Sequence, residues 1–483
     1  MPTYKLASFF ALFIFLTFTR CTEKPDKIVL DSSTPMYDLL EIQAANEIRA
    51  LVDNSTTSYF IYKGTPMGFE YELLARFAKA IKVELKVIPI KNLDYIIDSL
   101  LEYKGDIIAA NLTVTQERNK QVAFSEPLIR SKQVLVQRKK SHIEQEAAIF
   151  IKSPTELIDK EVYVRKNSSF YRRLMHLSHE IGSSIEIREV SGEVTVEELI
   201  KKVSEGEIDY TVADEHVAKI NKAYYRNIDI NTPISLEQKV AWAVRKESSD
   251  LLIALNAWLR KFKKTTDYRV IYLKYFGNTM LYKNRVNSSY FTRKSGVLSP
   301  FDELIKEYSS TIGWDWKLLT ALIYQESQFD HSAESWAGAN GLMQLMPATA
   351  EEYGIDSIGS PEENIKAGVN YLKWLTIQFT EKVKDSVERV KFILAAYNVG
   401  LGHVFDAMRL AEKNGKNPEK WEGNVAEMLL LKAKPEYYND PVVHYGYCRG
   451  SEPYKYVKEI FSRFEHYQNI IQGNDSKLLS EVN

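Results

Sequence analysis

Glu326 shares one face of a predicted helix with apolar side chains, and this placement suits acid chemistry. Leu319, Leu322 and Ile323 precede it at the spacing that puts all four residues on one stripe of an amphipathic helix. Because a carboxylate that faces a core is disfavoured in its charged form, we expect the pKa of Glu326 to be raised. A carboxylic acid that stays protonated near pH 7 can act as a general acid. The alternative is a glutamate at the edge of the stripe whose carboxylate reaches water.

The residues around Glu326 predict a helical domain that would hold it. From residue 299 to about residue 470 helical signals dominate, and no convincing strand pattern occurs. The run SPFD at 299–302 combines a capping serine, a proline in the first turn and an acid at the third position. The run SPEE at 360–363 repeats this pattern. We therefore expect an all-α or mostly α domain over residues 299–470, followed by a polar tail over residues 471–483.

The preceding part of the chain alternates strand and helix patterns over residues 41–276. Such alternation implies βαβ units and a largely parallel sheet. The segments that show it are predicted strands over 47–52, 83–88 and 161–165, predicted helices over 71–81 and 93–101, and a helix start at the capping run 167–169. Residues 277–298 are rich in Asn, Ser, Tyr and Lys without periodicity, so we place a linker there.

Residues 1–21 have the features of an export signal. The apolar run from Leu6 to Thr19 is too short to span a bilayer and follows a single lysine. Cys21 resembles the acylated cysteine of a bacterial lipoprotein, although Arg20 replaces the small residue of that pattern; an uncleaved N-terminal anchor is the alternative. With residues 22–40 as a polar tether, we expect an exported chain held at the periplasmic face of the outer membrane.

Composition and charge argue against several other functions. A net charge of −1 and the lack of a basic recognition motif give no reason to expect nucleic acid as a partner. The eight histidines show no metal-ligand spacing, so we expect neither a metal site nor another cofactor. The two cysteines, Cys21 and Cys448, are too few for a disulfide framework. A chain of 483 residues is long enough for two or three domains.

Several motifs in the helical region resemble those of the soluble-lytic-transglycosylase domain, a lysozyme-like fold that cleaves peptidoglycan. They are ALIYQESQF at 321–329, GLMQLMP at 341–347, AAYNVG at 395–400, YGYCRG at 445–450 and EPYKYV at 452–457, in the family's order and spacing. The resemblance implies that Glu326 is the catalytic acid and base. It further implies that the sugar is held by Ser335, Gln344, Tyr397 and Asn398.

Two other pairs in these motifs are better explained by packing. Met343 and Met346 suit a core beneath the cleft, because methionine fills irregular gaps. Tyr456 and Val457 are expected to dock the last helix.

The predicted domain has one catalytic carboxylate, whereas ordinary glycosidases use two. No second acid has a comparable motif, and Asp330 resembles a residue at the helix exit. The resemblance implies that the N-acetyl group of the substrate assists departure of the leaving sugar and that its own C6 hydroxyl then attacks. Cleavage of the MurNAc–GlcNAc bond would leave a 1,6-anhydro-MurNAc end and consume no water. A hydrolytic muramidase is the alternative.

The N-terminal region contains motifs that resemble the family-3 solute-binding proteins of amino-acid transporters. They are GFEYEL at 68–73, GDIIAANLTVTQER at 105–118, FSEP at 124–127 and DYTVAD at 209–214. The resemblance implies that Thr113 and Arg118 hold a ligand carboxylate and that Asp214 takes its ammonium group. A guanidinium grips a carboxylate through two parallel hydrogen bonds, which agrees with this role. The alternative for Arg118 is a surface ion pair with Glu117 or Glu126.

The two resemblances predict an α/β two-lobed periplasmic-binding-protein-like domain followed by a mainly α lysozyme-like domain. The expected function is a peptidoglycan lytic transglycosylase that acts on glycan strands. Its N-terminal cleft would sense a small wall peptide or amino acid and act through the 277–298 linker. The alternative is an amino-acid-binding protein whose helical domain is an accessory.

Overall fold

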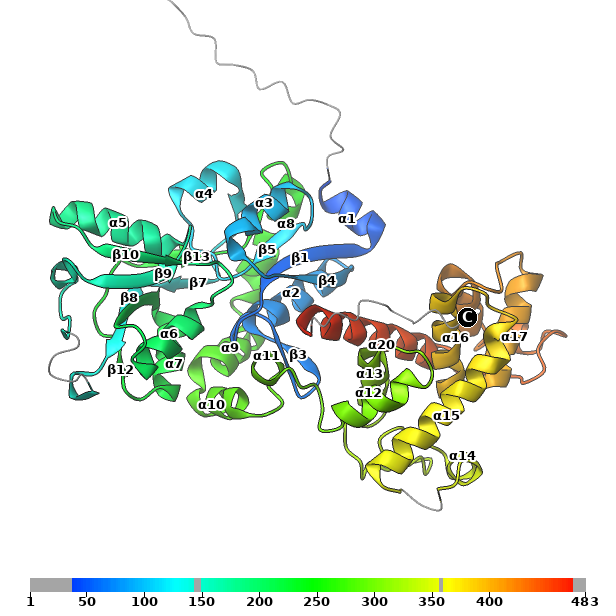
Figure 1. Ribbon diagram of the computed structural model, residues 1–483. Helices are drawn as coiled ribbons and strands as arrows, with labels where there is room; N and C mark the ends of the chain where they lie inside the picture. Colours follow the sequence, from blue (N-terminus) through cyan, green and yellow to red (C-terminus); the bar gives the residue numbers. More distant parts are fainter. Residues whose placement is uncertain (1–36, 143–148, 356–358, 472–483) are drawn as a thin grey trace, which may run out of the picture.

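The computed structural model describes residues 37–142, 149–355 and 359–471. Figure 1 shows an α/β half, coloured blue to green, and a helical half, coloured yellow to orange. Helix α20 (Ser451–Ile470) extends from the helical half to the α/β half, where it lies against β4. The expected signal over residues 1–21, with Cys21, and all but the first residue of the predicted tail lie outside the described residues.

Lobe 1 of the α/β half contains a five-stranded sheet. In spatial order its strands are β4 (Glu84–Ile90), β1 (Glu47–Asp53), β5 (Ile107–Ala109), β14 (Ala243–Val244) and β6 (Ala123–Phe124). Strand β1 pairs in parallel with both β4 and β5, and β14 and β6 add antiparallel pairs. The helices of this lobe are α1 (Leu39–Ala45), α2 (Phe69–Ala80), α3 (Ile96–Leu101), α4 (Gln116–Gln121), α8 (Ser249–Phe262) and α9 (Thr266–Tyr272).

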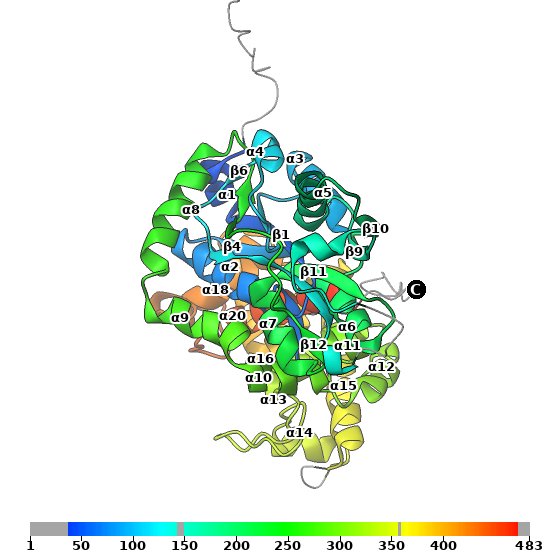
Figure 2. The same ribbon diagram turned by 90° about the vertical axis from the view of Figure 1, so that its left-hand side faces the viewer.

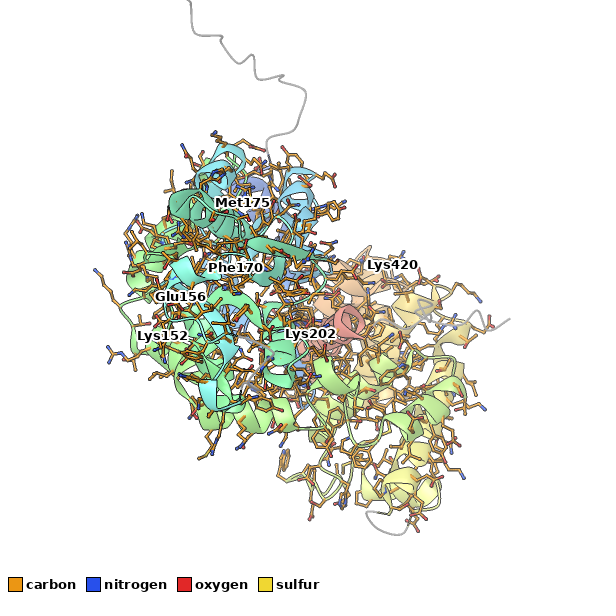
Figure 3. The ribbon with its side chains drawn as sticks, turned by 60° about the vertical axis from the view of Figure 1, so that its left-hand side comes forward. Lys152, Glu156, Phe170, Met175, Lys202 and Lys420 are labelled. Carbon is orange, nitrogen blue, oxygen red and sulfur yellow. The ribbon has the colours of Figure 1, made fainter. Side chains whose placement is uncertain are left out.

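Lobe 2 repeats this architecture. The strand order is β10 (Glu186–Val190), β9 (Glu161–Arg165), β11 (Tyr210–Asp214), β8 (Gln133–Arg138) and β12 (Ile228–Asp229). The covering helices are α5 (Ser169–Ile181), α6 (Val196–Glu205) and α7 (Glu215–Tyr224). Figure 3 brings lobe 2 forward, with Phe170 and Met175 on α5, whereas Lys420 lies across in the helical half.

The parallel strands of each lobe end at the junction between the lobes, so that their carboxyl ends face each other. A two-stranded ribbon of β7 (Ile129–Ser131) and β13 (Gln238–Val240) connects them. Figure 2 shows β9, β10 and β11 of lobe 2 in front of β1 and β4 of lobe 1. Ligands of open α/β sheets bind beyond the carboxyl ends of the strands, so this junction is where a ligand cleft is expected.

The helical half is built around one apolar core. Its helices are α12 (Asp302–Ser310), α13 (Trp316–Ser327), α14 (Pro347–Glu352), α15 (Pro361–Thr380), α16 (Ser386–Val399), α17 (Leu401–Lys413), α18 (Ala426–Leu431), α19 (Pro435–Tyr438) and α20. Helix α15 begins as predicted, with Ser360 as its cap, Pro361 in the first turn and Glu363 completing a capping box. Beyond residue 299 the described residues form only isolated β-bridges, so the predicted helical character is confirmed.

The strand predictions are close to the structure, and three boundary predictions are wrong. Residues 277–298 contain α10 (Thr279–Asn287) and α11 (Thr292–Ser295) instead of an irregular linker. Tyr282 and Phe291 are buried there because they pack on lobe 1 and lobe 2, a tertiary effect that helical periodicity does not reveal.

The other two corrections concern helix starts. The predicted tether over 22–40 overlaps α1, which begins at Leu39 because the Asp38 side chain caps it and also accepts from two backbone N–H groups of α8. Helix α12 begins at Asp302 and not at Ser299. The Asp302 carboxylate accepts from the backbone N–H groups of Leu298 and Ser299, so the SPFD run forms a turn before the helix.

A hairpin of lobe 1 is inserted into the helical half. Its strands are β2 (Phe60–Tyr62) and β3 (Thr65–Met67), and Ile61 belongs to the core of the helical half. At the turn, Gly64 has φ +73° and lies so close to Tyr324 and Tyr467 that a Cβ atom would clash with both. The Tyr467 hydroxyl donates to the Gly64 carbonyl oxygen at 2.9 Å. The two halves are therefore joined by interlocked elements as well as by the chain connection.

Candidate active site and ligand cleft

Glu326 lies in the last turn of α13, on the stripe that the sequence predicted. Leu319, Leu322 and Ile323 are fully buried in the core of the helical half. The helix ends directly after Glu326 because Gln328 adopts a left-handed conformation, with φ 52°. Glu326 itself is half-buried, so its carboxylate combines an apolar surrounding with access from outside.

Among the described residues, the carboxylate of Glu326 has one hydrogen-bond donor, the hydroxyl of Tyr456 on α20. Burial raises the pKa of Glu326 to about 7, and the bond from Tyr456 opposes this shift. Its charge in turn contributes to raising the pKa values of Tyr397 and Tyr456, although burial is the larger cause for both. Three elements, α13, α16 and α20, thus bring two tyrosines close to one carboxylic acid.

The other predicted cleft residues shape the loop that precedes α14. The Tyr397 hydroxyl donates to the carbonyl oxygen of Met343 at 2.7 Å. Gln344 has φ 47°, and its side-chain amide donates to the carbonyl oxygens of Ala333 and Gly341, both at 2.9 Å. The Ser335 hydroxyl oxygen accepts from the Ala339 N–H at 2.9 Å. These bonds fix the backbone of the loop.

The structure joins some of the predicted residues to Glu326 and not others. Tyr397 lies close enough for the charge of Glu326 to act on it. Asn398 is half-buried at the end of α16, and within the described residues no hydrogen bond links it to the other predicted residues. Asp330 lies outside α13, is exposed, and accepts from the backbone N–H and the hydroxyl of Ser332.

One packing prediction is wrong and three are confirmed. Tyr456 is buried in the core of the helical half as expected for a residue that docks the last helix, and its hydroxyl also donates to Glu326. Its place in the EPYKYV run marked it as part of a motif, but only the contact between α13 and α20 reveals the partner. Met346 is 46% exposed and not packed in the core. Met343 and Val457 are buried as expected.

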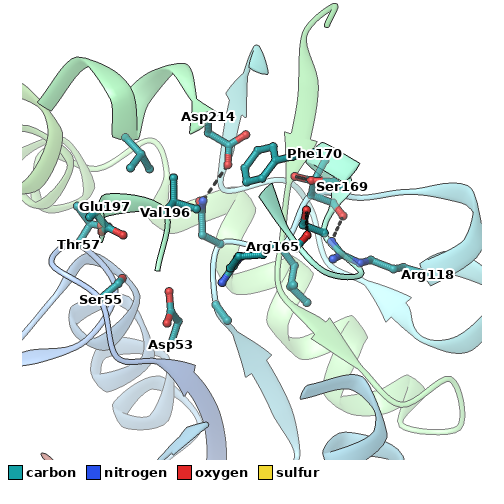
Figure 4. A pocket seen from close by; sticks show the side chains of 16 residues that line it. Asp53, Ser55, Thr57, Arg118, Arg165, Ser169, Phe170, Val196, Glu197 and Asp214 are labelled. Carbon is teal, nitrogen blue, oxygen red and sulfur yellow. Dashed lines mark hydrogen bonds between the residues drawn. The ribbon is translucent and has the colours of Figure 1, made fainter. Parts of the chain in front are cut away.

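The second candidate site is the cleft between the lobes, shown in Figure 4. Arg118 donates to the carbonyl oxygen of Thr113 at 2.9 Å, and burial lowers the pKa of its guanidinium to about 10. Burial raises the pKa of Asp214 to about 7, while a 3.0 Å bond from Asn111 and the charges of Arg165 and Arg118 oppose the shift. All three predicted ligand residues line this one cavity.

The surface ion pair considered for Arg118 is not formed. Glu117 pairs with Arg172 at 2.7 Å, and Glu126 pairs with Arg260 at 3.3 Å. The guanidinium of Arg118 is thus left for the cleft. Sequence reasoning missed Asp53, Arg165 and Glu197, which also line the cavity. Asp53 directly follows the predicted strand 47–52 and Arg165 ends the predicted strand 161–165, so their positions at the sheet edge were a usable signal.

The lobes touch directly across this cleft. Thr56 donates to Glu197 at 2.8 Å, Ser169 donates to Thr113 at 3.1 Å, and Asn111 donates to Asp214. The cavity between them is about 40 Å³, which accommodates water-sized molecules. The structure therefore represents a closed arrangement of the lobes.

Three further features of the described residues bear on the sequence analysis. No group of His, Cys, Asp and Glu side chains in the described ranges has the arrangement of a metal site. Among the same residues, no helix has the length and apolar character needed to cross a bilayer. Cys448 is a buried free thiol.

Comparisons with known proteins agree with both halves of the structure. Residues 303–420 match the family model of the transglycosylase SLT domain, and residues 48–278 match bacterial extracellular solute-binding proteins, family 3. Solved structures similar to the α/β half include an ArgBP mutant from T. maritima (28% identity, 50% of this chain and 99% of that chain, TM-score 0.43). Another is the ancestral amino acid-binding protein AncCDT-1 (26% identity, 49% and 98% coverage, TM-score 0.41).

The similarity to whole proteins extends over nearly the entire chain. A membrane-bound lytic murein transglycosylase F from Desulfosudis oleivorans is 37% identical over 90% of this chain and 93% of its own length. Proteins of the same name from Pseudomonas fluorescens (32% identity, 92% and 87% coverage) and Aeromonas hydrophila (31%, 96% and 88%) are also similar. The two-lobed α/β domain and the mainly α domain occur in the expected order. The chain belongs to the membrane-bound lytic murein transglycosylase F family.

Proposed function

We propose that Glu326 is the catalytic acid of this lytic transglycosylase and that it cleaves the MurNAc–GlcNAc bond of peptidoglycan. The observation that carries the proposal is a half-buried carboxyl group whose pKa is raised to about 7 and which has one tyrosine donor. Such a group holds its proton near neutral pH and can still be reached by a glycan.

The proposed reaction uses the same carboxyl group twice. Glu326 first donates its proton to the glycosidic oxygen, so the GlcNAc side leaves as an alcohol while the substrate's N-acetyl oxygen closes on C1. The Glu326 carboxylate then removes the proton from the C6 hydroxyl of MurNAc. That oxygen forms the new bond to C1 and displaces the N-acetyl oxygen. The products are a 1,6-anhydro-MurNAc end and a free GlcNAc hydroxyl, and Glu326 is protonated again.

Each tyrosine has a role in this scheme. The Tyr456 hydroxyl donates to Glu326 and stabilises the carboxylate that exists between the two proton transfers. Tyr397 donates to the carbonyl oxygen of Met343 and so fixes the backbone of the loop that precedes α14. Asp330, the nearest acid in sequence, is exposed, and its bonds to Ser332 lower its pKa, which makes it a poor second acid.

The test is digestion of purified sacculi followed by mass spectrometry of the fragments. Anhydro ends have a mass one water below that of reducing ends, so anhydro products support the lyase and reducing ends support a hydrolytic muramidase. Glu326→Gln is the matched variant, since it keeps the size of the side chain and removes the acid. Full turnover by this variant would contradict the assignment of Glu326.

We further propose that the α/β domain senses a wall-derived peptide or amino acid and changes the cleavage rate. Thr113 and Arg118 would bind a carboxylate and Asp214 an ammonium group. The contacts that support communication start at the cleft, because residues 55–57 line it or bond across it and lead directly into the β2–β3 hairpin.

The hairpin reaches the catalytic helix. Thr65 and Tyr324 are hydrogen-bonded through their hydroxyl groups at 2.7 Å, and Tyr324 lies two residues before Glu326. On the neighbouring helix α20, His466 is bonded to Tyr59 of lobe 1 at 2.7 Å, and Tyr456 contacts Glu326. A movement of lobe 1 relative to the helical half would therefore act on both the acid and its donor.

Binding and cleavage should be measured on the same preparation. Wall tetrapeptide and free amino acids are titrated by calorimetry, and sacculus cleavage is followed with and without each compound. If none binds or changes the rate, the sensing proposal fails, whereas the catalytic proposal is unaffected.

We also propose that acylated Cys21 anchors the chain at the periplasmic face of the outer membrane. The names of these relatives describe them as membrane-bound, which supports an anchor. Metabolic labelling with radioactive palmitate should mark the wild-type chain and not Cys21→Ala. Labelling of both would refute the assignment of Cys21.

A further inference from the structure

Basic residues are concentrated in one segment of the α/β half. Residues 251–301 contain ten lysines and arginines and a single acid, Asp267, whereas the whole chain has a net charge of −1. Acids that contact this segment are paired: Asp267 with Arg76 at 2.5 Å, and Glu72 with Lys274 at 2.6 Å. The excess of positive charge is therefore not cancelled by neighbouring elements.

Several of these cations face solvent. In the part of the chain that the structure describes, four of them are exposed and form no ion pair: Lys261 in the last turn of α8, Lys264 just after it, Arg269 on α9 and Lys283 on α10. Exposed lysines and arginines alone are ordinary on a protein surface. The side chains between them are unusual.

Large apolar side chains are exposed on the same elements. They are Val270 (56% exposed), Leu273 (51%), Met280 (72%) and Leu281 (49%). On α9 the helical spacing places Arg269, Val270 and Leu273 on the outward side, because Ile271 and Tyr275 are buried in the core of lobe 1. Exposed apolar groups that gather on one surface mark an interaction site more often than apolar residues scattered singly.

The elements that carry these side chains follow one another along one edge of the α/β half. Figures 1 and 2 both show α9 next to α10, and Figure 2 shows α8 leading down to α9. A single helical turn, Leu273–Gly277, joins α9 to the cap of α10 and contacts both helices. We call the outward surface of residues 261–283 the cationic face.

The chemistry of the cationic face restricts its partner. A glycan strand or a wall peptide is polar and offers little to Leu273 and Met280. A second copy of the chain would bring the same cations together, which is unfavourable. The surface of a bilayer that contains anionic phospholipid offers both phosphates for the cations and an apolar interior for the exposed side chains.

We propose that the cationic face docks on a bilayer that contains anionic phospholipid. Lys261, Lys264, Arg269 and Lys283 bind the headgroup phosphates, and Leu273 and Met280 enter the boundary between headgroups and acyl chains. The docking is independent of the reaction at Glu326 and of a ligand between the lobes.

The position of the first described residue is compatible with a lipid anchor at Cys21. The Ser248 hydroxyl donates to the carbonyl oxygen of Tyr37 at 3.2 Å, directly before α8. Helix α8 has 14 residues and is thus about 21 Å long, and its far end carries Lys261. Residues 22–36 can span at most about 50 Å. An anchor at Cys21 and the cationic face can therefore reach the same bilayer.

The test is flotation of residues 22–483 with lipid vesicles. This chain contains every residue that the structure describes and lacks Cys21, whose acyl group would bind any bilayer. Vesicles of phosphatidylethanolamine and phosphatidylglycerol (3:1) are compared with vesicles of phosphatidylcholine, at about 0.1 M salt. We expect binding to the anionic vesicles to be at least about tenfold tighter.

Two double variants separate the charges from the apolar side chains. Lys264→Gln with Arg269→Gln should weaken binding to anionic vesicles about 25-fold, since each cation near such a surface contributes about fivefold. Leu273→Ser with Met280→Ser should weaken it at least about tenfold. Circular dichroism and the melting temperature show that the variants are folded.

Matched controls are available on α15 of the helical half. Lys366 and Lys373 are exposed there, and Ile377 is 65% exposed. Lys366→Gln with Lys373→Gln makes the same change of charge, and Ile377→Ser removes an exposed apolar side chain. Both controls should bind anionic vesicles as the wild-type chain does.

The proposal fails if the wild-type chain binds neither kind of vesicle or binds both equally. It also fails if the charge control on α15 loses as much binding as Lys264→Gln with Arg269→Gln, because net charge alone would then be responsible. Heparin, a polyanion without acyl chains, tests the remaining alternative. If Leu273→Ser with Met280→Ser binds anionic vesicles normally while heparin displaces the wild-type chain, the cationic face recognises an acidic macromolecule and not a bilayer.

Discussion

The proposed active site and the cleft between the lobes each contain a carboxyl group whose pKa is raised to about 7, namely Glu326 and Asp214. Burial is the main cause at both places. Their surroundings differ, because Glu326 has one tyrosine donor, whereas Asp214 has an amide donor and lies within range of two guanidinium groups. Equal pKa values can therefore prepare a carboxyl group for opposite uses.

The difference lies in the protonation state that each carboxyl group needs for its proposed role. In its proposed role Glu326 is protonated when the glycan arrives, and among the described residues no cation contributes to its pKa. In its proposed role Asp214 is ionised when an ammonium group arrives, and that group supplies the countercharge. In the structure, the side-chain amide of Asn111 donates to the Asp214 carboxylate, at the group proposed to bind the ligand's ammonium. The comparison predicts opposite responses to substitution and to pH.

The largest effect is expected from replacing Glu326, the proposed catalytic acid. Glu326→Gln should lower the rate of sacculus cleavage about 10²- to 10⁴-fold, which is the usual contribution of a general acid. Asp214→Asn should leave the cleavage rate without ligand within about twofold, because the site lies in the other domain. Cleavage rates of both variants at pH 6.5 check this. A comparable loss of cleavage rate in Asp214→Asn would contradict the distinction between the two carboxyl groups.

Glu326→Gln should lower the cleavage rate but raise the stability of the folded chain at alkaline pH. The pKa of Glu326 is higher in the folded chain than the usual value of 4.5, so its stabilising effect is full below that value and is lost as the pH rises through about 7. Glu326→Gln cannot ionise. It should therefore raise the free energy of unfolding at pH 8 by at most about 3 kcal/mol, with little change at pH 4. Denaturant titrations at both pH values measure this.

The fold and the acid were accessible from the sequence because they depend on local patterns. The spacing of Leu319, Leu322, Ile323 and Glu326 defined the stripe on α13, and the SPEE run gave the start of α15. Alternating strands and helices gave the two lobes. In each case, residues near in sequence decide the structure.

Other features depend on contacts between distant residues, and these were missed. Tyr456 meets Glu326 only because α20 packs on α13, more than a hundred residues later in the chain. The helices in 277–298 are held by Tyr282, which bonds to Asn221 of lobe 2 and to Thr56 of lobe 1. Asp53 and Arg165 come together through two separate sheets.

The next effect in size is an opposite pH dependence at the two clefts. If protonated Glu326 is the active form, kcat/KM for cleavage should fall about tenfold between pH 6 and pH 8. If ionised Asp214 is the binding form, the affinity for an amino acid should rise about tenfold over the same range. Cleavage rates and calorimetry in one buffer series test both. If kcat/KM and the affinity both rose or both fell with pH, the proposed difference between Glu326 and Asp214 would be contradicted.

A smaller effect should follow from removing the tyrosine donor. The hydroxyl of Tyr456 stabilises ionised Glu326 and so lowers its pKa. In Tyr456→Phe the alkaline limb of the pH profile should therefore move upward, by up to about one pH unit, while the maximal rate falls several-fold. Tyr397→Phe serves as a control, since its hydroxyl bonds to Met343 and not to Glu326. It should lower the rate without moving the limb.

The smallest effect concerns the connection between the two clefts. Thr65→Val removes the hydroxyl that bonds to Tyr324 and keeps the shape of the side chain, so cleavage without ligand should change less than about twofold. The ratio of cleavage rates with and without a cleft ligand should approach one, because the hairpin no longer holds α13 through that bond. Thr380→Val, on an exposed turn of α15, is the matched control and should keep the wild-type ratio. An unchanged ratio in Thr65→Val would show that coupling, where it exists, runs through α20 and the Tyr59–His466 contact instead.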